Sequence, residues 1–380
     1  MGRLLILAAV VAIFIYGMTA ALLGTILPYL STRFQLTPRQ NGTIATAQAL
    51  GLMIASLGVG PLLDDVGKKF GISLGLVFIF LALVALPRAS GFRSVVFLMF
   101  LLGMGGGIVT TAANALTSDV GEAHRAVALN LVNIFFGLGG LATPFISANL
   151  FARNWVRLCS WVAGLTVVAL GVQIAAHMPP PTGAGRFILA DAGPVLGRPL
   201  LFLLCLFMFL YVGCEVGVWN WLVRHLIAEG VPEKHALNIL SLGFALGLLL
   251  GRVAVAPILV RVPPAEVTLV ASIAMAITTF LMLRIHRVSA SWMLVFFAGL
   301  SMAPVFPTAL AIVGNAFPRM TGTAIGIVIT CGWAGLAISS RIIGAIAGGD
   351  PRRLGKALLV IPVSSVLMVG INLAILALPR

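Results

Sequence analysis

The stretch that decides how this chain is interpreted is Gly60-Pro61-Leu62-Leu63-Asp64-Asp65-Val66-Gly67-Lys68-Lys69, an acidic and then basic turn between two long apolar runs. It is not a phosphate loop, because six residues rather than four separate Gly60 from Gly67 and no Ser or Thr follows Lys68. The turn is therefore predicted to connect two helices.

Composition on both sides of this turn places the chain in a membrane. Of its 380 residues, 60% are hydrophobic and only 9% are charged, which is too little polar surface for a soluble domain. A membrane-spanning helix needs about 20 apolar residues. Twelve such runs are present, over residues 4–30, 41–63, 70–87, 95–117, 126–150, 157–178, 198–225, 235–259, 266–284, 290–314, 322–347 and 357–378.

The runs fall into two groups of six. Residues 179–197 begin with three prolines and form a polar stretch long enough for a cytoplasmic linker, so the predicted bundles are 1–178 and 198–380. Short matches recur in the same order in both. They pair the glycines of 51–60 with Gly243, Gly247 and Gly251, Gly103 with Gly299, and Gly140-Leu141-Ala142 with Gly335-Leu336-Ala337. The expected fold is an all-α membrane protein with twelve transmembrane helices in two pseudo-symmetric six-helix bundles.

Charge and cysteine content exclude several classes of function. The net charge is +14, but the basic residues are scattered among the loops, which favours anionic lipid headgroups over nucleic acid as the partner. The cysteines show no paired spacing, so neither a disulfide frame nor a metal site is expected, and no cofactor is predicted. No nucleophile or phosphate loop can be assembled either, so the chain is not expected to be an enzyme.

One carboxylate stands well inside an apolar run. Glu215 lies on the same predicted helix face as Tyr211 and Trp219, four residues away on either side. An acid in a membrane helix usually faces a water-filled cavity or a partner. A phenol, an acid and an indole together suit a polyol, whereas the structural alternative is a protonated glutamate that only holds helices together.

Other polar and aromatic groups inside apolar runs complete the predicted substrate site. Trp219, Trp333 and Tyr16 are expected to stack on the solute, and Asn and Thr side chains to hydrogen-bond it. In membrane helices such amides and hydroxyls also serve as interhelical hydrogen-bond partners, which is the alternative here. The predicted substrate-binding residues are Tyr16, Asn114, Asn130, Asn133, Tyr211, Glu215, Trp219, Asn220, Thr330 and Trp333.

The 60–69 turn resembles the loop signature of the major facilitator superfamily, G-x-L-x-D-x-x-G-K/R-K/R. In that superfamily the loop is cytoplasmic, and the resemblance implies a gating role for Gly60, Asp64, Gly67 and Lys68. Arg252, at the end of a glycine ridge, is expected to be their counterpart at a similar cytoplasmic depth. The alternative is a solvated loop that only sets topology. Counting basic residues in the loops gives no support for a cytoplasmic N-terminus.

The stretch from Tyr211 to His225, with Tyr-Val-Gly-x-Glu and Trp-x-Trp-Leu elements, resembles the seventh helix of the fucose permease family of sugar symporters. In the fucose permease the proton-carrying carboxylates lie on the first and fourth helices, and neither run contains Asp or Glu here. Glu215 and Arg341, counted to a similar membrane depth, are therefore predicted to pair and to couple the ion.

The resemblance implies a secondary active transporter that moves a small polar organic solute, a sugar or polyol, by alternating access. The coupling ion is expected to be a proton, or alternatively sodium. The chain is expected to act as a monomer in the cell membrane, the inner membrane of a bacterium. An organic-anion carrier with Arg341 as the carboxylate clamp and a non-transporting ligand sensor of the same fold are the alternatives.

Overall fold

The computed structural model describes residues 2–36, 38–151, 154–176, 196–284, 288–348 and 353–378. In this part of the chain, twelve helices are long and apolar enough to cross a membrane, and no strand occurs. The predicted all-α fold with twelve transmembrane helices is confirmed. Residues 179–195 of the predicted linker, 179–197, lie outside the described part of the chain. The bundle boundaries at 178 and 198 therefore stay a prediction.

Contact clustering divides the chain into two compact units. Unit 1 takes its described residues from 1–125, 132–193 and 316–330, and unit 2 takes them from 126–131, 194–315 and 331–380. Unit 1 therefore contains the start of a helix from the second half of the sequence. Unit 2 contains the first turns of a helix from the first half.

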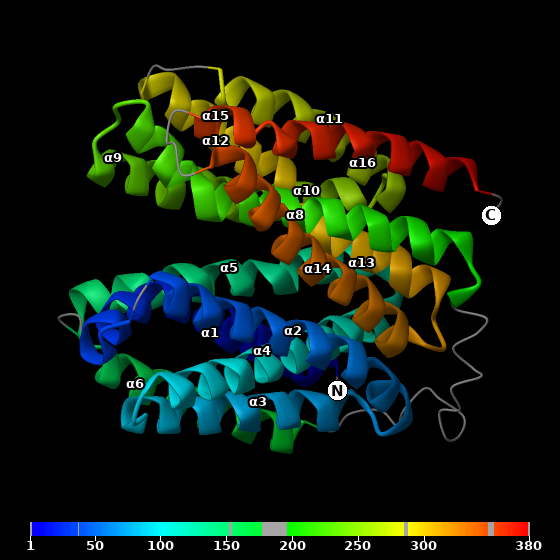
Figure 1. Cartoon of the computed structure of the whole chain (residues 1–380). Helices are drawn as coiled ribbons and strands as arrows, with labels where there is room; N and C mark the ends of the chain where they lie inside the picture. Colours follow the sequence, from blue (N-terminus) through cyan, green and yellow to red (C-terminus); the bar gives the residue numbers. More distant parts are fainter. Residues whose placement is uncertain are drawn as a thin grey trace. The chain divides into compact units, whose positions relative to one another are not determined.

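The helices of the first half are shown in blue to green (Figure 1). They are α1 (Gly2–Phe34), α2 (Pro38–Asp65), α3 (Lys68–Ala85), α4 (Phe92–Val120), α5 (Arg125–Asn149) and α6 (Trp155–Ala175), with short 3₁₀ turns at Leu86–Arg88 (η1) and Glu122–His124 (η2). Helix α4 packs against α1, α2 and α3, and it is the most buried span of this group.

The second half follows in green to red (Figure 1). Its elements are α8 (Pro199–Ala228), α9 (Glu233–Asn238), the π-helical segment η4 (Ile239–Ala245), α10 (Leu246–Leu259), α11 (Pro264–Met282), α12 (Val288–Met302), α13 (Val305–Ala316), α14 (Thr321–Ala347), α15 (Leu354–Ala357) and α16 (Val360–Ala377). Segments η4 and α10 form one span, and α12 and α13 form another that is broken at Ala303 and Pro304.

In each half of the sequence, two helices pack against each other at glycines. The glycines of the two pairs have the same register. At Gly51 of α2 and Gly103 of α4, a Cβ would overlap a backbone oxygen of the opposite helix. The same is true of Gly247 in α10, and of Gly299 in α12, which meets the carbonyl of Phe244 in η4. The matching glycines are 196 residues apart in both cases, which confirms the predicted match of Gly103 with Gly299. Small residues permit this backbone contact, which drives helix association in membranes.

The same register extends along both pairs. The Ser56 hydroxyl donates to the Gly107 carbonyl at 3.3 Å, and Arg252 Nε donates to the Ala303 carbonyl at 3.4 Å. Donors and acceptors are again 196 residues apart, as are the prolines within the helices, Pro61 and Pro257. Arg252 therefore occupies the place of Ser56 in the repeat.

The match for the eleventh span is corrected by one residue. Gly139 of α5 lies against the carbonyl of Phe14, and Gly335 of α14 lies against the carbonyl of Phe209. These glycines are also 196 residues apart, so Gly335 corresponds to Gly139 and not to Gly140. Two adjacent glycines made the sequence match ambiguous by one position.

The glycine contacts predict that a Gly→Ala change lowers the stability of the protein at contact positions and not elsewhere. Gly51→Ala and Gly247→Ala should each destabilise the protein by about 1–3 kcal/mol, because the Cβ forces two helix backbones apart. Gly58→Ala is the matched control on α2, where nothing lies within 4 Å of the added Cβ. The measurement is the temperature at which half of the detergent-solubilised protein stays monodisperse. Equal melting of Gly51→Ala and Gly58→Ala would contradict the packing described here.

Candidate functional site

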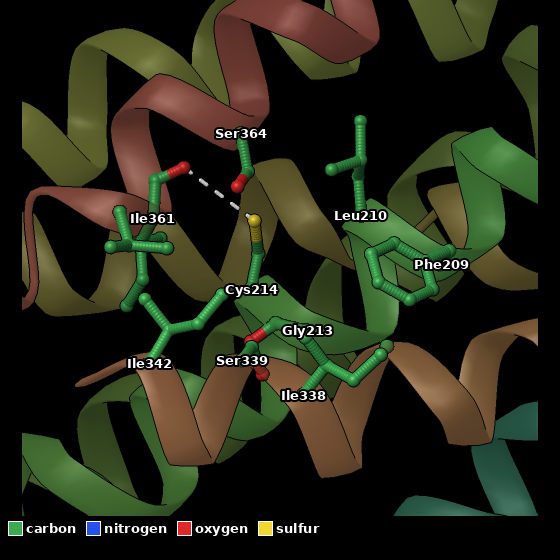
Figure 2. Close-up of a pocket in the computed structure, with 11 residues that line it drawn as sticks. Phe209, Leu210, Gly213, Cys214, Ile338, Ser339, Ile342, Ile361 and Ser364 are labelled. Atoms are coloured by element: carbon green, nitrogen blue, oxygen red, sulfur yellow. Dashed lines mark hydrogen bonds between the residues drawn. The ribbon is translucent and has the colours of Figure 1, made fainter. Parts of the chain in front are cut away.

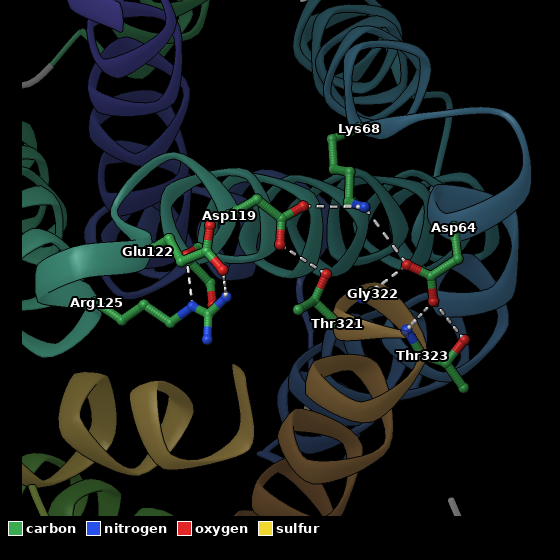
Figure 3. Close-up of polar contacts among 9 residues, drawn as sticks. Asp64, Lys68, Asp119, Glu122, Arg125, Thr321, Gly322 and Thr323 are labelled. Atoms are coloured by element: carbon green, nitrogen blue, oxygen red, sulfur yellow. Dashed lines mark hydrogen bonds and ion pairs between the residues drawn. The ribbon is translucent and has the colours of Figure 1, made fainter. Parts of the chain in front are cut away.

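The connection between α2 and α3 forms a polar cluster with the start of α14. This loop cluster consists of Asp64, Lys68, Asp119, Thr321 and Thr323 (Figure 3). The chain turns at Gly67 with a φ of 105°, a left-handed conformation that favours glycine. Gly60 permits close approach, because a Cβ there would lie 2.8 Å from the backbone oxygen of Gly322.

Asp64 caps the N-terminus of α14 from a different helix. Its carboxylate accepts hydrogen bonds from the Gly322 N–H at 3.0 Å and from the Thr323 N–H at 2.8 Å and hydroxyl at 2.7 Å. The first N–H groups of a helix have no partner within it, and the helix dipole makes this end positive. Asp64 is buried, so water competes little for these bonds.

Lys68 joins two carboxylates in the same cluster. Its ammonium lies 3.5 Å from Asp64 Oδ1 and 3.1 Å from Asp119 Oδ2. The other oxygen of Asp119 accepts a hydrogen bond from the Thr321 hydroxyl at 2.9 Å. Four predicted gating residues, Gly60, Asp64, Gly67 and Lys68, thus lie together, and their function as a gate stays a prediction.

A second polar group within unit 1 joins α1, α4 and α5. This amide cluster contains three predicted substrate residues, Tyr16, Asn114 and Asn133. Asn133 Nδ2 donates to Asn114 Oδ1 at 2.8 Å, and Asn114 Nδ2 donates to the Thr110 carbonyl at 2.7 Å. The Tyr16 ring packs on Phe136 with centroids 5.1 Å apart. The two amides thus bond each other, the Tyr16 ring packs on a residue three positions after Asn133, and all three predicted residues are buried.

Unit 2 gathers polar groups at the break between α12 and α13. Tyr211 is fully buried, and its hydroxyl donates to the Met302 carbonyl at 2.9 Å. The adjacent carbonyl, of Ala303, accepts the bond from Arg252. Both Glu215, half-buried on the next turn of α8, and Arg252 interact electrostatically with the Tyr211 hydroxyl. We call Tyr211, Glu215, Arg252 and these two carbonyls the break cluster.

The remaining predicted substrate residues are spread over several helices. Asn130 Nδ2 donates to the Thr308 hydroxyl at 3.1 Å, within unit 2. Trp219 is 37% exposed and meets Phe244 edge-on at 5.3 Å. Thr330 donates back to the carbonyl of Gly326 at 2.7 Å. Asn220 is exposed and Trp333 is half-buried.

The predicted pairing of Glu215 with Arg341 is not seen as an ion pair, and it stays a prediction. No ion pair between described residues joins them, and Arg341 is exposed. Helices α8 and α14 meet where the Ser339 hydroxyl donates to the Gly213 carbonyl at 3.2 Å. Glu215 and Arg341 each follow these contact residues by two positions, or about 200° around a helix, so both point away from the contact.

The repeat register assigns Arg252 a position different from that of Asp64, and its gating role stays a prediction. In the 196-residue repeat the counterpart of Asp64 is Val260, and Arg252 precedes this position by eight residues. At about 1.5 Å per residue, Arg252 therefore lies roughly 12 Å deeper along its helix than the level that Asp64 occupies in α2. Its guanidinium donates a hydrogen bond to the broken span of unit 2, at the Ala303 carbonyl.

Two cavities in unit 2 do not match the predicted site. The first, of about 100 Å³, lies between α8, α14 and α16 beside the Cys214 thiol, which donates to the Ile361 carbonyl at 3.5 Å (Figure 2). It is smaller than the roughly 300–1,000 Å³ typical of ligand pockets. The second, of about 470 Å³, lies between α10, α11 and α12 and is mostly apolar. Neither is lined by a predicted substrate residue.

Comparison with known proteins settles the family. A family model described as Major Facilitator Superfamily matches residues 9–340. The chain belongs to the major facilitator superfamily. It is therefore a transporter of the superfamily and an integral, multi-pass membrane protein.

The relatives of this superfamily member carry names that point to different functions. It is 24% identical to Bypass of stop codon protein 6 of Saccharomyces cerevisiae, over 91% of this chain and 77% of that protein. It is 24% identical to the gentisate transporter of Corynebacterium glutamicum, over 85% and 76%. It is 23% identical to the glucose/mannose transporter GlcP of Bacillus subtilis, over 93% and 90%.

The fold is shared with a solved sugar symporter of the superfamily. The structure of the E. coli fucose:proton symporter FucP matches with a TM-score of 0.80 at 18% identity, over 97% of this chain and 98% of that chain. The predicted membership of the superfamily, with its likeness to the fucose permease, is confirmed.

Sequence analysis missed three of the five residues of the loop cluster. Asp119, Thr321 and Thr323 are separated from Asp64 by long stretches of chain, and only the structure brings them together. A signal was present: Ser118-Asp119 ends an apolar run, and Thr321-Gly322-Thr323 begins another, where free N–H groups attract a carboxylate. Arg125, which donates to the Ser118 carbonyl at 2.9 Å, was missed as well.

The loop cluster predicts a kinetic defect in Asp64→Asn. The change removes the charge that Lys68 and the α14 N-terminus share, while keeping the shape of the side chain. Charge-assisted bonds contribute about 1.5–3 kcal/mol, so turnover should fall tenfold or more, with equilibrium binding of a transported solute changed far less. Uptake and thermal-shift titration measure the two quantities. The control is Asp65→Asn, an exposed neighbour, which should behave as wild type. Loss of binding in folded Asp64→Asn would argue against a gating role.

Proposed function

We propose that this superfamily member is a secondary active transporter that moves a small polar organic solute, a sugar or polyol, by alternating access with a proton as the coupled ion. The observation that carries the proposal is the amide cluster, where Asn133 bonds Asn114 and the Tyr16 ring packs on Phe136, which follows Asn133 by three residues on α5. Flat aromatic faces suit the apolar faces of sugar rings, and neutral amides both donate to and accept from hydroxyl groups. Resemblance to a glucose/mannose transporter and to a fucose:proton symporter supports the same class.

Glu215 is the proposed carrier of the coupled proton. Among the acidic residues that the structure describes, it is the one that lies in the middle of a span rather than near an end or in a loop. A carboxyl group at this depth is costly when ionised, so it exchanges a proton more readily than it holds a permanent charge. Sodium is the alternative coupling ion. We propose that the chain works as a monomer in the inner membrane of a bacterium.

An organic-acid carrier is the second candidate. Likeness to the gentisate transporter favours it, because gentisate carries a carboxylate. Arg341 is exposed on α14 and is the proposed clamp, since a guanidinium binds a carboxylate through two parallel hydrogen bonds.

Measuring uptake of sugars and of gentisate in the same liposomes distinguishes the sugar transporter from the organic-acid carrier. Protein in liposomes with an alkaline interior should accumulate labelled glucose or fucose, and collapse of the pH gradient by a protonophore should abolish accumulation. Accumulation of gentisate instead, lost in Arg341→Gln, would establish the organic-acid carrier. Binding without uptake of any solute would contradict transport and favour a sensor.

One variant tests the amide cluster within the same panel. Asn114→Leu removes the amide but keeps the approximate volume, and loss of a hydrogen bond worth about 1.5 kcal/mol should lower sugar uptake about tenfold. Thr166→Val is the matched control, because the Thr166 hydroxyl bonds only within its own helix, to the Val162 carbonyl at 2.8 Å. Full uptake by Asn114→Leu would remove Asn114 from the substrate site.

A further inference from the structure

Helices α8 and α14 keep one register along their contact within unit 2. Gly335 of α14 lies against the carbonyl of Phe209, and one turn later the Ser339 hydroxyl donates to the Gly213 carbonyl at 3.2 Å. Both contacts join residues that are 126 positions apart. The numbers rise together on the two helices, so the helices run in parallel. A residue of α8 on this face therefore lies opposite the α14 residue numbered 126 higher.

The same register places two thiols opposite each other. Cys205 and Cys331 are 126 positions apart, and each precedes its helix's contact residue, Phe209 or Gly335, by four positions. Residues four apart share one helix face, because they differ by only about 40° around the axis. A hydrogen bond between the two thiols agrees with this placement. The pair was not visible in the sequence, since the spacing is set by the packing of two helices.

The two helices are close enough at this contact for a covalent bond between side chains. One turn after the Gly335 contact, a Cβ on Gly213 would lie 3.1 Å from the Cβ of Ser339. Cysteines in a disulfide have Cβ atoms about 3.5–4.5 Å apart. The cysteine turn lies on the opposite side of the same Gly335 contact, at the same distance of four residues along α14.

The repeat shows that helix packing does not require thiols at these positions. In the first half of the sequence, the equivalent contact places Gly139 of α5 against the carbonyl of Phe14 in α1. Four residues earlier on each helix stand Val10 and Phe135, which carry no reactive group. The thiol pair is therefore a feature of unit 2 alone.

Exposure and the number of ligands favour oxidation of this pair over metal binding. Cys205 and Cys331 are both half-buried, whereas Cys159 and Cys214 are buried, so a small uncharged reagent has better access to the pair. Among the residues that the structure describes, no group of three or more Cys, His, Asp or Glu side chains could hold a metal ion. A structural zinc ion needs four ligands. Two facing thiols without further ligands suit a disulfide.

We propose that Cys205 and Cys331 form a modification site, where hydrogen peroxide oxidises the two thiols to a disulfide between α8 and α14. The first sulfur attacks the O–O bond, becomes a sulfenic acid and releases one water. The second sulfur attacks the sulfenic sulfur, forms the S–S bond and releases another water. The two sulfurs supply the two electrons that reduce the peroxide, and both thiol protons end in water. Cys331 is the first residue of α14 that belongs to unit 2, so the bond holds α14 on α8 where it enters this unit.

Treating the purified, reduced protein with hydrogen peroxide tests the proposal without any solute. A maleimide that labels thiols after denaturation should count four before oxidation and two after it. Peptide mapping without reductant should find the peptides of Cys205 and Cys331 linked, and dithiothreitol should restore all four thiols. Cys205→Ser should yield no linked peptides. Cys214→Ser is the matched control on the same helix and should form the link as wild type does.

Phenylarsine oxide tests the proximity of the thiols in the wild-type protein without oxidation. Its arsenic binds two thiols at once and releases water, so it should protect Cys205 and Cys331 together from the maleimide. Absence of the Cys205–Cys331 link from the oxidised wild type would overturn the proposal, and so would full labelling of both cysteines in the presence of the arsenical. A link that instead contains Cys159 or Cys214 would overturn it as well. The sugar assignment can fail without affecting these results, since no solute is used.

Discussion

Backbone-to-backbone contact between helices at glycine is the constraint on which the rest of this structure depends. Within a membrane, apolar side chains do not drive helices together, and close approach requires residues without a Cβ. Gly51 and Gly103 fix the register of α2 on α4, and Gly247 and Gly299 fix that of α10 and η4 on α12. Since both pairs share one register, every other residue on these helices acquires a defined counterpart 196 positions away.

The two halves share this helix register but place different side chains at equivalent positions. At the place where unit 1 has Ser56 bonding an unbroken α4, unit 2 has Arg252 bonding a span that is broken before Pro304. A cation buried at membrane depth is costly unless it has partners, and such residues mark functional sites. Apart from the loop cluster, unit 1 joins the neutral amides of Asn114 and Asn133, whereas unit 2 brings the ionisable Tyr211 and Arg252 to the break between α12 and α13. This division suits solute recognition in the first and ion coupling in the second.

Sequence alone predicted what depends on local patterns. Apolar runs of sufficient length gave the twelve spans, and the 60–69 turn gave the superfamily, because both signals lie in consecutive residues. The partners of Asp64 were not predictable, since Gly322 and Thr323 lie more than 250 positions away. Counting residues from a span end gives depth but no direction around the helix, which is why Glu215 was paired with Arg341. For Arg252, the repeat register gives a position eight residues before the counterpart of Asp64, which the glycine ridge alone did not show.

The central claim, that one carboxyl group in unit 2 links solute binding to a proton, is tested most directly by proton release or uptake on binding. Purified protein in weakly buffered detergent solution should exchange up to about one proton per molecule when a transported solute saturates it. The exchange should be absent in Glu215→Gln, which should still bind the solute. Proton exchange of equal size in wild type and Glu215→Gln, or none in wild type at any pH while the solute binds, would contradict the account.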